Sequence, residues 1–205
     1  MKKILFIILV IIFNLSLNAQ QNFYYYQGEK IFLQQRTDKM FLKFAFGIQK
    51  ERILALIDSD SSLQPTSDIN LDELDLYQNS IKYVVLEAKE GNQISSATIE
   101  FYKAMEEIIS ATFLFQYNET LQGLMDEFVI KLRETTSYAQ LQELAEKNFC
   151  TIGEENPFVK NQFMLHVAKT SNIDALQMSN LFYETGLFEW TSPSFFSCGG
   201  SIILH

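Results

Sequence analysis

The sequence has few of the residue types from which most metal and thiol sites are built. Its only histidines are His166 and His205, and its only cysteines are Cys150 and Cys198. A zinc ion usually needs three or four clustered ligands, and the cysteines lack the C-x-x-C spacing of a zinc or redox site. We therefore predict no metal site and no cofactor. We expect the two thiols to be unpaired, with a disulfide between them as the alternative that export would permit.

The scarcity of histidine also limits the catalysis that can be expected. His166 lies in a strand-like segment of alternating character, where we interpret it as a structural histidine rather than a general base. The sequence contains no recognisable nucleophile motif, phosphate-binding loop or paired-carboxylate site. It therefore predicts no catalytic residue and argues against an enzyme.

Positive charge is scarce as well. The chain has 16 Lys and Arg against 25 Asp and Glu, a formal net charge of −9. A nucleic-acid-binding protein needs a basic patch to neutralise phosphates, and an acidic surface is repelled by anionic lipids. We therefore predict no nucleic-acid partner and, once the leader described next is removed, no membrane partner.

The one long apolar run stands at the amino terminus. Lys2 and Lys3 precede an apolar stretch from Ile4 to Phe13, and Leu17-Asn18-Ala19 has the small residue of a cleavage site. The stretch is shorter than the roughly 20 residues of a transmembrane helix. We predict a signal peptide over residues 1–19 and an exported protein, periplasmic or extracellular, with a retained anchor as the alternative.

The remaining sequence contains a repeat, because its second half follows the same plan as its first. Each half has a short apolar strand followed by an amphipathic helix, then a second clear strand, then a helix that carries an aromatic pair. The matching pairs are 41–44 with 129–132, 83–89 with 163–169, and 101–102 with 182–183. The order β-α-β-β-α-β is that of the ferredoxin-like arrangement, an antiparallel sheet with both helices on one face.

We therefore predict an α+β protein with an N-terminal β-hairpin and two tandem ferredoxin-like modules. The hairpin occupies residues 20–36, with Gly28 in its turn, and its aromatic residues are expected to pack against the first module. The modules occupy residues 37–119 and 126–196, joined by a linker over 118–126. An irregular tail is expected over 197–205.

The helices have recognisable starts. Ser95 or Ser96 can cap a helix of the first module, and Ser137 with Gln140 forms a capping box in the second. Asp174 with Gln177 is expected to form another capping box, and Gly186 to end that helix. In the helix after Ser95 the 3.6-residue period predicts a buried stripe of Ala97, Phe101, Ala104, Met105 and Ile108.

Three segments resemble the amino-terminal, prodomain-like region of exported bacterial subtilisin-like serine peptidases. They are residues 24–31, 127–132 and 175–193, and the resemblance covers nearly all of the chain after the leader. In that family such regions contain ferredoxin-like modules, precede the catalytic domain, and assist its folding or occupy its active-site cleft. The family's Asp-Ser/Thr-Gly, His-Gly-Thr and Gly-Thr-Ser elements are absent here, so no catalytic residue is carried over.

The resemblance implies an exported, non-catalytic protein that binds a subtilisin-like peptidase as an inhibitor or a folding assistant. The segment expected to enter the peptidase cleft as an added strand is Ser192, Pro193, Ser194, Phe195, Phe196, Ser197 and Cys198. The alternatives are an exported interaction module with an unknown partner, a truncated peptidase precursor, and a remnant without function.

Overall fold

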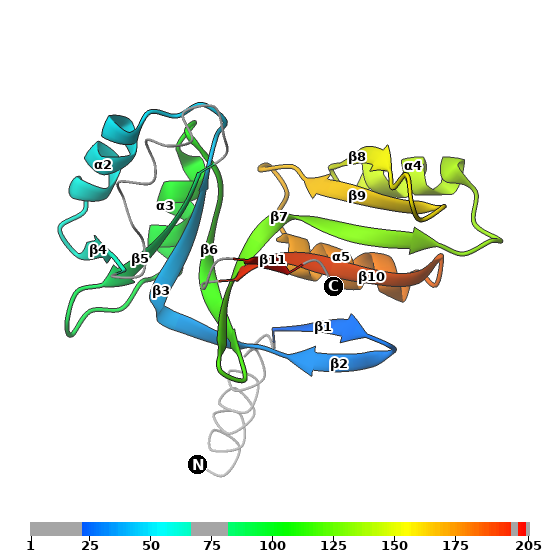
Figure 1. Cartoon of the computed structure of the whole chain (residues 1–205), viewed down its shortest axis with the longest axis horizontal. Coiled ribbons are helices and arrows are strands. Elements are labelled where there is room, and N and C mark those ends of the chain that lie inside the picture. The colour runs from blue at the N-terminus through cyan, green and yellow to red at the C-terminus, as the bar shows by residue number, and fades with distance from the viewer. Residues whose placement is uncertain (1–21, 67–81, 198–200, 204–205) are drawn as a thin grey trace, which may run out of the picture.

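The computed structural model describes residues 22–66 and 82–197 and the backbone of residues 201–203. It is an α+β structure in which all strand pairs among these residues are antiparallel (Figure 1). None of the described helices is long and apolar enough to cross a membrane. The predicted signal peptide and Cys198 lie outside the described residues.

The predicted amino-terminal hairpin is confirmed, but it packs on a different part of the molecule than expected. Strands β1 (Phe23–Tyr26) and β2 (Glu29–Phe32) are joined by Gln27 and Gly28, both with positive φ. The Tyr25 ring stacks on Tyr183 of the last helix with 4.2 Å between centroids. The predicted packing on the first unit is therefore wrong, because the aromatic partners of the hairpin belong to the second.

The first half of the chain forms one βαββαβ unit. Its elements are β3 (Gln34–Phe44), α2 (Lys50–Asp58), β4 (Leu63–Pro65), β5 (Tyr83–Ala88), α3 (Ser96–Ala104) and β6 (Ile108–Tyr117). The strand order across the sheet is β6-β3-β5-β4. The core of this unit lies between the sheet and both helices, and is built from residues such as Met40, Leu42, Phe44, Ile53, Leu86 and Tyr102.

The second half repeats this order. Its elements are β7 (Thr120–Leu132), α4 (Tyr138–Lys147), β8 (Cys150–Glu155), β9 (Gln162–Val167), α5 (Ala175–Glu184) and β10 (Phe188–Ser197). The strand order is β10-β7-β9-β8. A separate core again lies between sheet and helices, with Phe128, Ile130, Leu141, Leu165, Phe182 and Phe188 among its residues.

The two halves are joined through the sheet and not by the predicted linker over 118–126. Only Asn118 and Glu119 form a turn between β6 and β7, and β7 pairs with β6 along its first residues. Because β7 continues into the second unit, where it pairs with β9 and β10, the sheet is continuous through both units. The predicted irregular tail over 197–205 is also corrected, since β11 (Ser201–Ile203) pairs with the end of β10.

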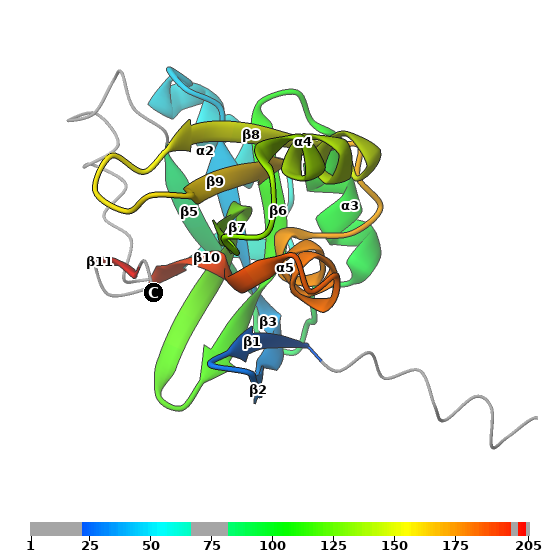
Figure 2. The same ribbon diagram turned by 90° about the vertical axis from the view of Figure 1, so that its right-hand side faces the viewer.

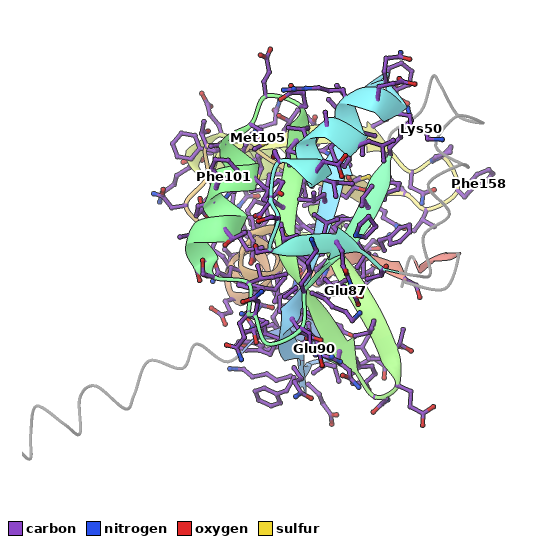
Figure 3. The ribbon with its side chains drawn as sticks, turned by 90° about the vertical axis from the view of Figure 1, so that its left-hand side faces the viewer. Lys50, Glu87, Glu90, Phe101, Met105 and Phe158 are labelled. Atoms are coloured by element: carbon purple, nitrogen blue, oxygen red, sulfur yellow. The ribbon has the colours of Figure 1, made fainter. Side chains whose placement is uncertain are left out.

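The predicted buried stripe of the helix after Ser95 is wrong for Ala97, Phe101 and Ala104, which are exposed. Helix α3 buries Ile99 and Tyr102, whereas Phe101 is 58% exposed, and Ile108 belongs to the next strand. Figure 3 shows Phe101 on the outer side of this helix. Of the five predicted residues, only the half-buried Met105 and Ile108, which is 1% exposed, contact the core of the first unit.

The predicted helix caps are confirmed with one exception. Ser95 accepts the Thr98 amide, and Ser137 with Gln140 forms a complete capping box at α4. Asp174 accepts the Gln177 amide at α5, but this cap is not a reciprocal box. Gly186 has a φ of +74° after the last turn of α5, as a glycine that ends a helix should.

Candidate functional site

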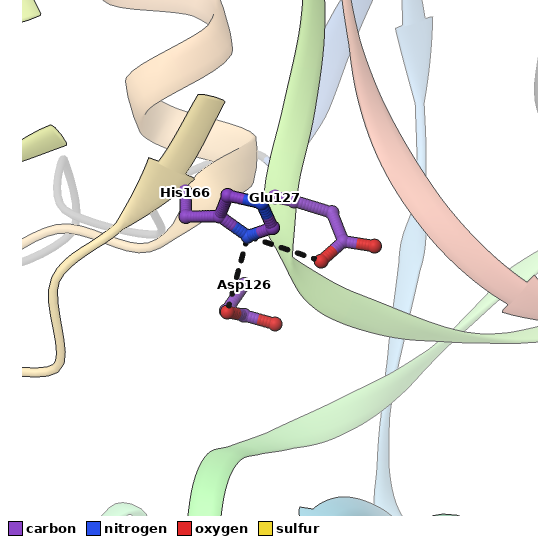
Figure 4. A group of neighbouring side chains, drawn as sticks. All are labelled: Asp126, Glu127 and His166. Carbon is purple, nitrogen blue, oxygen red and sulfur yellow. Dashed lines mark ion pairs between the residues drawn. The ribbon is translucent and has the colours of Figure 1, made fainter. Parts of the chain in front are cut away.

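The most unusual polar feature of the described residues is a charged cluster where the two units meet. It consists of Lys43 from β3, Asp126 and Glu127 from β7, and His166 from β9. The Lys43 Nζ donates to Asp126 Oδ1 and, at 2.9 Å, to Glu127 Oε2. The His166 Nδ1 lies 3.4 Å from Glu127 Oε2 and 3.8 Å from Asp126 Oδ2 (Figure 4).

Local structure explains why these side chains meet. Side chains alternate between the faces of a strand, so Lys43 points away from the helix-covered core that receives Leu42 and Phe44. Glu127 is paired directly with His166 in the register of β7 and β9. The strand β7 leaves β6 just before this point, and its two acidic residues thus stand where the first unit passes into the second.

The electrostatics of the cluster keep all four groups charged at neutral pH. The Asp126 carboxylate, and then that of Glu127, raise the pKa of His166 to about 9. Burial opposes ionisation of both carboxyl groups, but His166 and Lys43 outweigh it and lower the pKa of each. Burial likewise opposes the charge of Lys43, whose pKa is nevertheless raised by the two carboxylates.

These charges balance, and this limits what the cluster can do chemically. A general base must be able to accept a proton near the working pH, but His166 already holds one and both carboxylates are engaged by cations. The side-chain atoms of Lys43 are only 4% exposed. The arrangement therefore works first as an ion-pair network that ties β3 of one unit to β7 and β9 of the other.

Geometry alone would allow a metal ion at this position. One ligand atom each from Asp126, Glu127 and His166 lie within 4.8 Å of one another. A metal would require the imidazole to lose its proton, and it would have to compete with Lys43 for carboxylate oxygens. The donor set therefore fits a cation poorly while Lys43 is present.

The segment predicted to bind a peptidase lies in the sheet. Residues 192–197 form the end of β10, where they pair with β7, and Phe195 to Ser197 also pair with β11. Pro193, Ser194 and Phe195 are buried, while Ser192, Phe196 and Ser197 are partly exposed. Pro193 stands at an irregularity in the pairing with β7, where its missing N–H is tolerated.

Two rings of this segment join parts of the molecule. Phe195 packs against Tyr24 of the hairpin with 5.8 Å between centroids. Phe196 stacks on Tyr83 and Phe41 of the first unit at 5.0 and 5.4 Å. In this conformation the segment therefore contributes to the contact between the two units, and its binding of a partner stays a prediction.

Sequence analysis identified His166 as a strand histidine but did not find the carboxylates beside it. The signal that could have found them is the occurrence of charge inside apolar strands. Lys43 interrupts the run Met40 to Phe44, and Asp126 and Glu127 interrupt the run from Leu124 to Leu132. Such charges are rarely buried without a partner of opposite sign.

Comparisons with protein-family models, with curated proteins and with solved structures gave no match for this chain.

Proposed function

We propose that the two units are ferredoxin-like modules. The strand orders β6-β3-β5-β4 and β10-β7-β9-β8 support this proposal, since each places the fourth strand beside the first and the second at the far edge. A split β-α-β arrangement with both helices on one sheet face has this order. The two helix-side cores are consistent with it.

We further propose that the chain is an exported, non-catalytic protein that binds a subtilisin-like serine peptidase, as an inhibitor or a folding assistant. The repeated strand order is the single observation that supports this function. The prodomain-like regions of subtilisin-like peptidases, which the sequence resembles, contain ferredoxin-like modules. The balanced charge of the cluster of Lys43, Asp126, Glu127 and His166 supports a non-catalytic role. Each of its carboxylates is paired with a cation, so no side chain of the cluster is free to accept a proton at neutral pH.

The binding segment in this proposal is residues 192–198 at the end of β10. An extended segment can add a strand to the substrate cleft of a peptidase through backbone hydrogen bonds. Since Phe195 to Ser197 pair with β11, insertion into a cleft requires β11 to detach first. A short strand of three residues contributes few hydrogen bonds, and its detachment is therefore the least costly opening of this edge.

A titration against a subtilisin-like peptidase from the same organism tests the proposal. We expect inhibition or a stable complex at micromolar concentrations, and tighter binding by a variant that lacks residues 199–205, because this deletion removes β11 and opens the edge of β10. Absence of both inhibition and complex formation, for the full chain and for the shortened variant, would overturn the proposal.

A second candidate is an exported interaction module whose partner is not a peptidase. It is favoured by the burial of Pro193, Ser194 and Phe195, which leaves little of the predicted binding segment available in this conformation. Binding would then use another surface of the molecule. Failure to form a peptidase complex, together with equal binding of a non-peptidase exported protein by the parent and by the Phe196→Ala variant, would favour this candidate over the cleft-binding mechanism.

A further inference from the structure

The outer edge of β8 is a free pairing edge among the described residues. This strand pairs only with β9 and forms the rim of the second unit's sheet (Figure 2). The Ala168 N–H donates to the Phe149 carbonyl at 2.8 Å. Because antiparallel residues alternate between facing the partner strand and facing away, Cys150 and Ile152 direct their backbone N–H and C=O groups to the open side.

Large apolar side chains stand at both ends of this edge. Phe149 precedes β8 and is 64% exposed, and Phe158 in the turn after β8 is 93% exposed, with Val159 beside it at 40%. Phe149 also has a φ of +55°, which is uncommon for a bulky residue. The sequence assigns no role to these rings. The positive φ of Phe149 ends helix α4, because this residue directly follows the C-cap Asn148.

The negative charge near this edge favours a basic segment as the added strand and disfavours an acidic one. Glu154 and Glu155 are exposed on β8, and the whole chain has a formal net charge of −9. A second copy would bring like charges together across the new strand pair, which is destabilising. The chain's own residues 67–81 contain four acidic and no basic residues, so the same repulsion applies to them.

We propose that the free edge of β8 binds an extended, basic segment of another protein as an added β-strand. The open groups of Cys150 and Ile152 supply the backbone hydrogen bonds, Phe149 and Phe158 contact apolar side chains at the two ends, and Glu154 attracts Lys or Arg. This site is distinct from the end of β10. The proposal is compatible with either of the functions proposed above.

A labelled eight-residue peptide in which lysine alternates with valine probes the edge, with fluorescence anisotropy as the readout. We expect binding that weakens as salt is added, and none by the same peptide with glutamate in place of lysine. Hydrogen exchange on the saturated complex should slow at the Cys150 and Ile152 amides. A few weak contacts give a dissociation constant of about 1 mM. Absence of binding at about 1 mM peptide would therefore overturn the proposal.

Three substitutions locate the binding. Phe149→Gly and Phe158→Ser should each weaken peptide binding about tenfold, as the loss of an aromatic anchor does, and Glu154→Lys should weaken it and allow the glutamate peptide to bind. The matched control is Phe101→Ser on α3, an exposed ring far from β8 in sequence, which should leave binding unchanged.

Phe149→Gly separates binding from folding. Glycine adopts a φ of +55° readily, so this variant should unfold at the same or a higher denaturant concentration than the parent while it loses peptide affinity. Affinity unchanged in all three β8 variants, or protection of amides elsewhere, would overturn the proposal, as would dimerisation through β8 in the absence of peptide. A negative result in the peptidase titration leaves this prediction intact, because that titration does not use the β8 edge.

Discussion

The second strand of each unit occupies the same place in the sheet but differs in what it offers a partner. In the first unit this strand is β4, which has three residues and ends at Pro65. In the second unit it is β8, which has six residues and no proline. Short edges and proline, which lacks an N–H, both limit strand addition. The same plan is thus built twice, and the second copy has the longer pairing edge.

The two units also meet across the back of the first unit's sheet. In the first unit Phe41 and Tyr83 are stacked against Phe196, which comes from the second unit. Lys43 on the same face is held by Asp126 and Glu127. The first unit therefore uses its sheet face for contact with its neighbour.

The largest expected effect tests whether the two units unfold together. Phe44 and Phe128 are fully buried in the separate cores of the first and second unit. Replacing either by alanine should lower the free energy of unfolding by about 3–5 kcal/mol. Because β7 is continuous through the junction, we expect one cooperative urea transition in both variants, followed by circular dichroism and by the fluorescence of Trp190, the only tryptophan.

Different curves for the two probes would contradict this expectation. If Phe44→Ala shifts the circular dichroism curve while the Trp190 fluorescence keeps its midpoint, the first unit unfolds by itself. Coincident probes are the usual test of a two-state transition. The two units would then be independent domains that unfold separately.

The second prediction removes the charge that holds the units together. Lys43→Met keeps the length of the side chain but leaves Asp126 and Glu127 with only the half-exposed His166. We expect a loss of about 3 kcal/mol in the free energy of unfolding at pH 7, as for other buried pairs that lose one partner. The deficit should shrink in acid, where both carboxyl groups become protonated and need no cation.

A pH series of urea unfolding curves measures this effect. Lys39→Met is the control, since Lys39 pairs with Glu87 within the first unit at a more exposed position. An equal loss in the control variant, or a deficit independent of pH, would show that the carboxylates are not the cause.

The third prediction concerns the close approach of Gly123 to Phe41. A Cβ atom at Gly123 would lie 2.5 Å from the Cγ and Cδ2 atoms of the Phe41 ring, which is fully buried. Gly123→Ala should therefore cost about 1–3 kcal/mol through overpacking, measured by urea unfolding. Gly153→Ala on β8 is the comparison, because its Cβ would lie 3.1 Å from the Met164 carbonyl oxygen and 3.9 Å from the Met164 Cβ. We expect a smaller loss there.

Gly123 also explains one failure of the sequence analysis. The sequence predicts a linker over residues 118–126, yet Thr120 to Asp126 are the first part of β7. A glycine inside a strand weakens the strand pattern, although it often marks a close approach of two segments. The neighbour that requires it, Phe41, lies some eighty positions earlier in the sequence, and no local pattern identifies such a contact.

The elements were more predictable than their packing. The hairpin, the Ser137 capping box and the β-α-β-β-α-β order of the second half could be found because periodicity and cap residues are local signals. The buried face of α3 could not, since a nine-residue helix offers more than one apolar stripe and tertiary contacts chose Ile99 and Tyr102. The charged cluster was missed for the same reason, because it joins three strands that are distant in sequence.

The fourth prediction uses the pH dependence of His166. Its pKa is raised in the folded protein from its usual value of 6.5 to about 9 by the carboxylates of Asp126 and Glu127. A group whose pKa rises on folding contributes its full stabilisation below the unfolded pKa and loses it as the pH rises through the folded value. His166→Gln should therefore be less stable than the parent at pH 6, and the difference should fade between about pH 6.5 and 9.

Thermal unfolding across this range and an NMR titration of the His166 ring measure the two quantities. We expect a modest stability difference, since the side chain is 44% exposed and solvent screens its ion pairs. A midpoint of the ring titration near 6.5 would contradict the proximity of the carboxylates. A stability difference constant from pH 6 to pH 10 would assign the effect to packing instead.

The smallest expected effect comes from exchanging helix caps between the units. Ser137 caps α4 with a complete box, whereas Gln49 precedes α2 with an extended backbone and no side-chain cap. Ser137→Ala should cost about 1 kcal/mol, and Gln49→Ser should gain up to about the same amount because it supplies the missing acceptor. If the double variant matches the parent in urea unfolding, the caps are energetically equivalent and the units share one transition. If Gln49→Ser does not restore the free energy of unfolding lost through Ser137→Ala, the second unit alone determines the unfolding transition of the molecule.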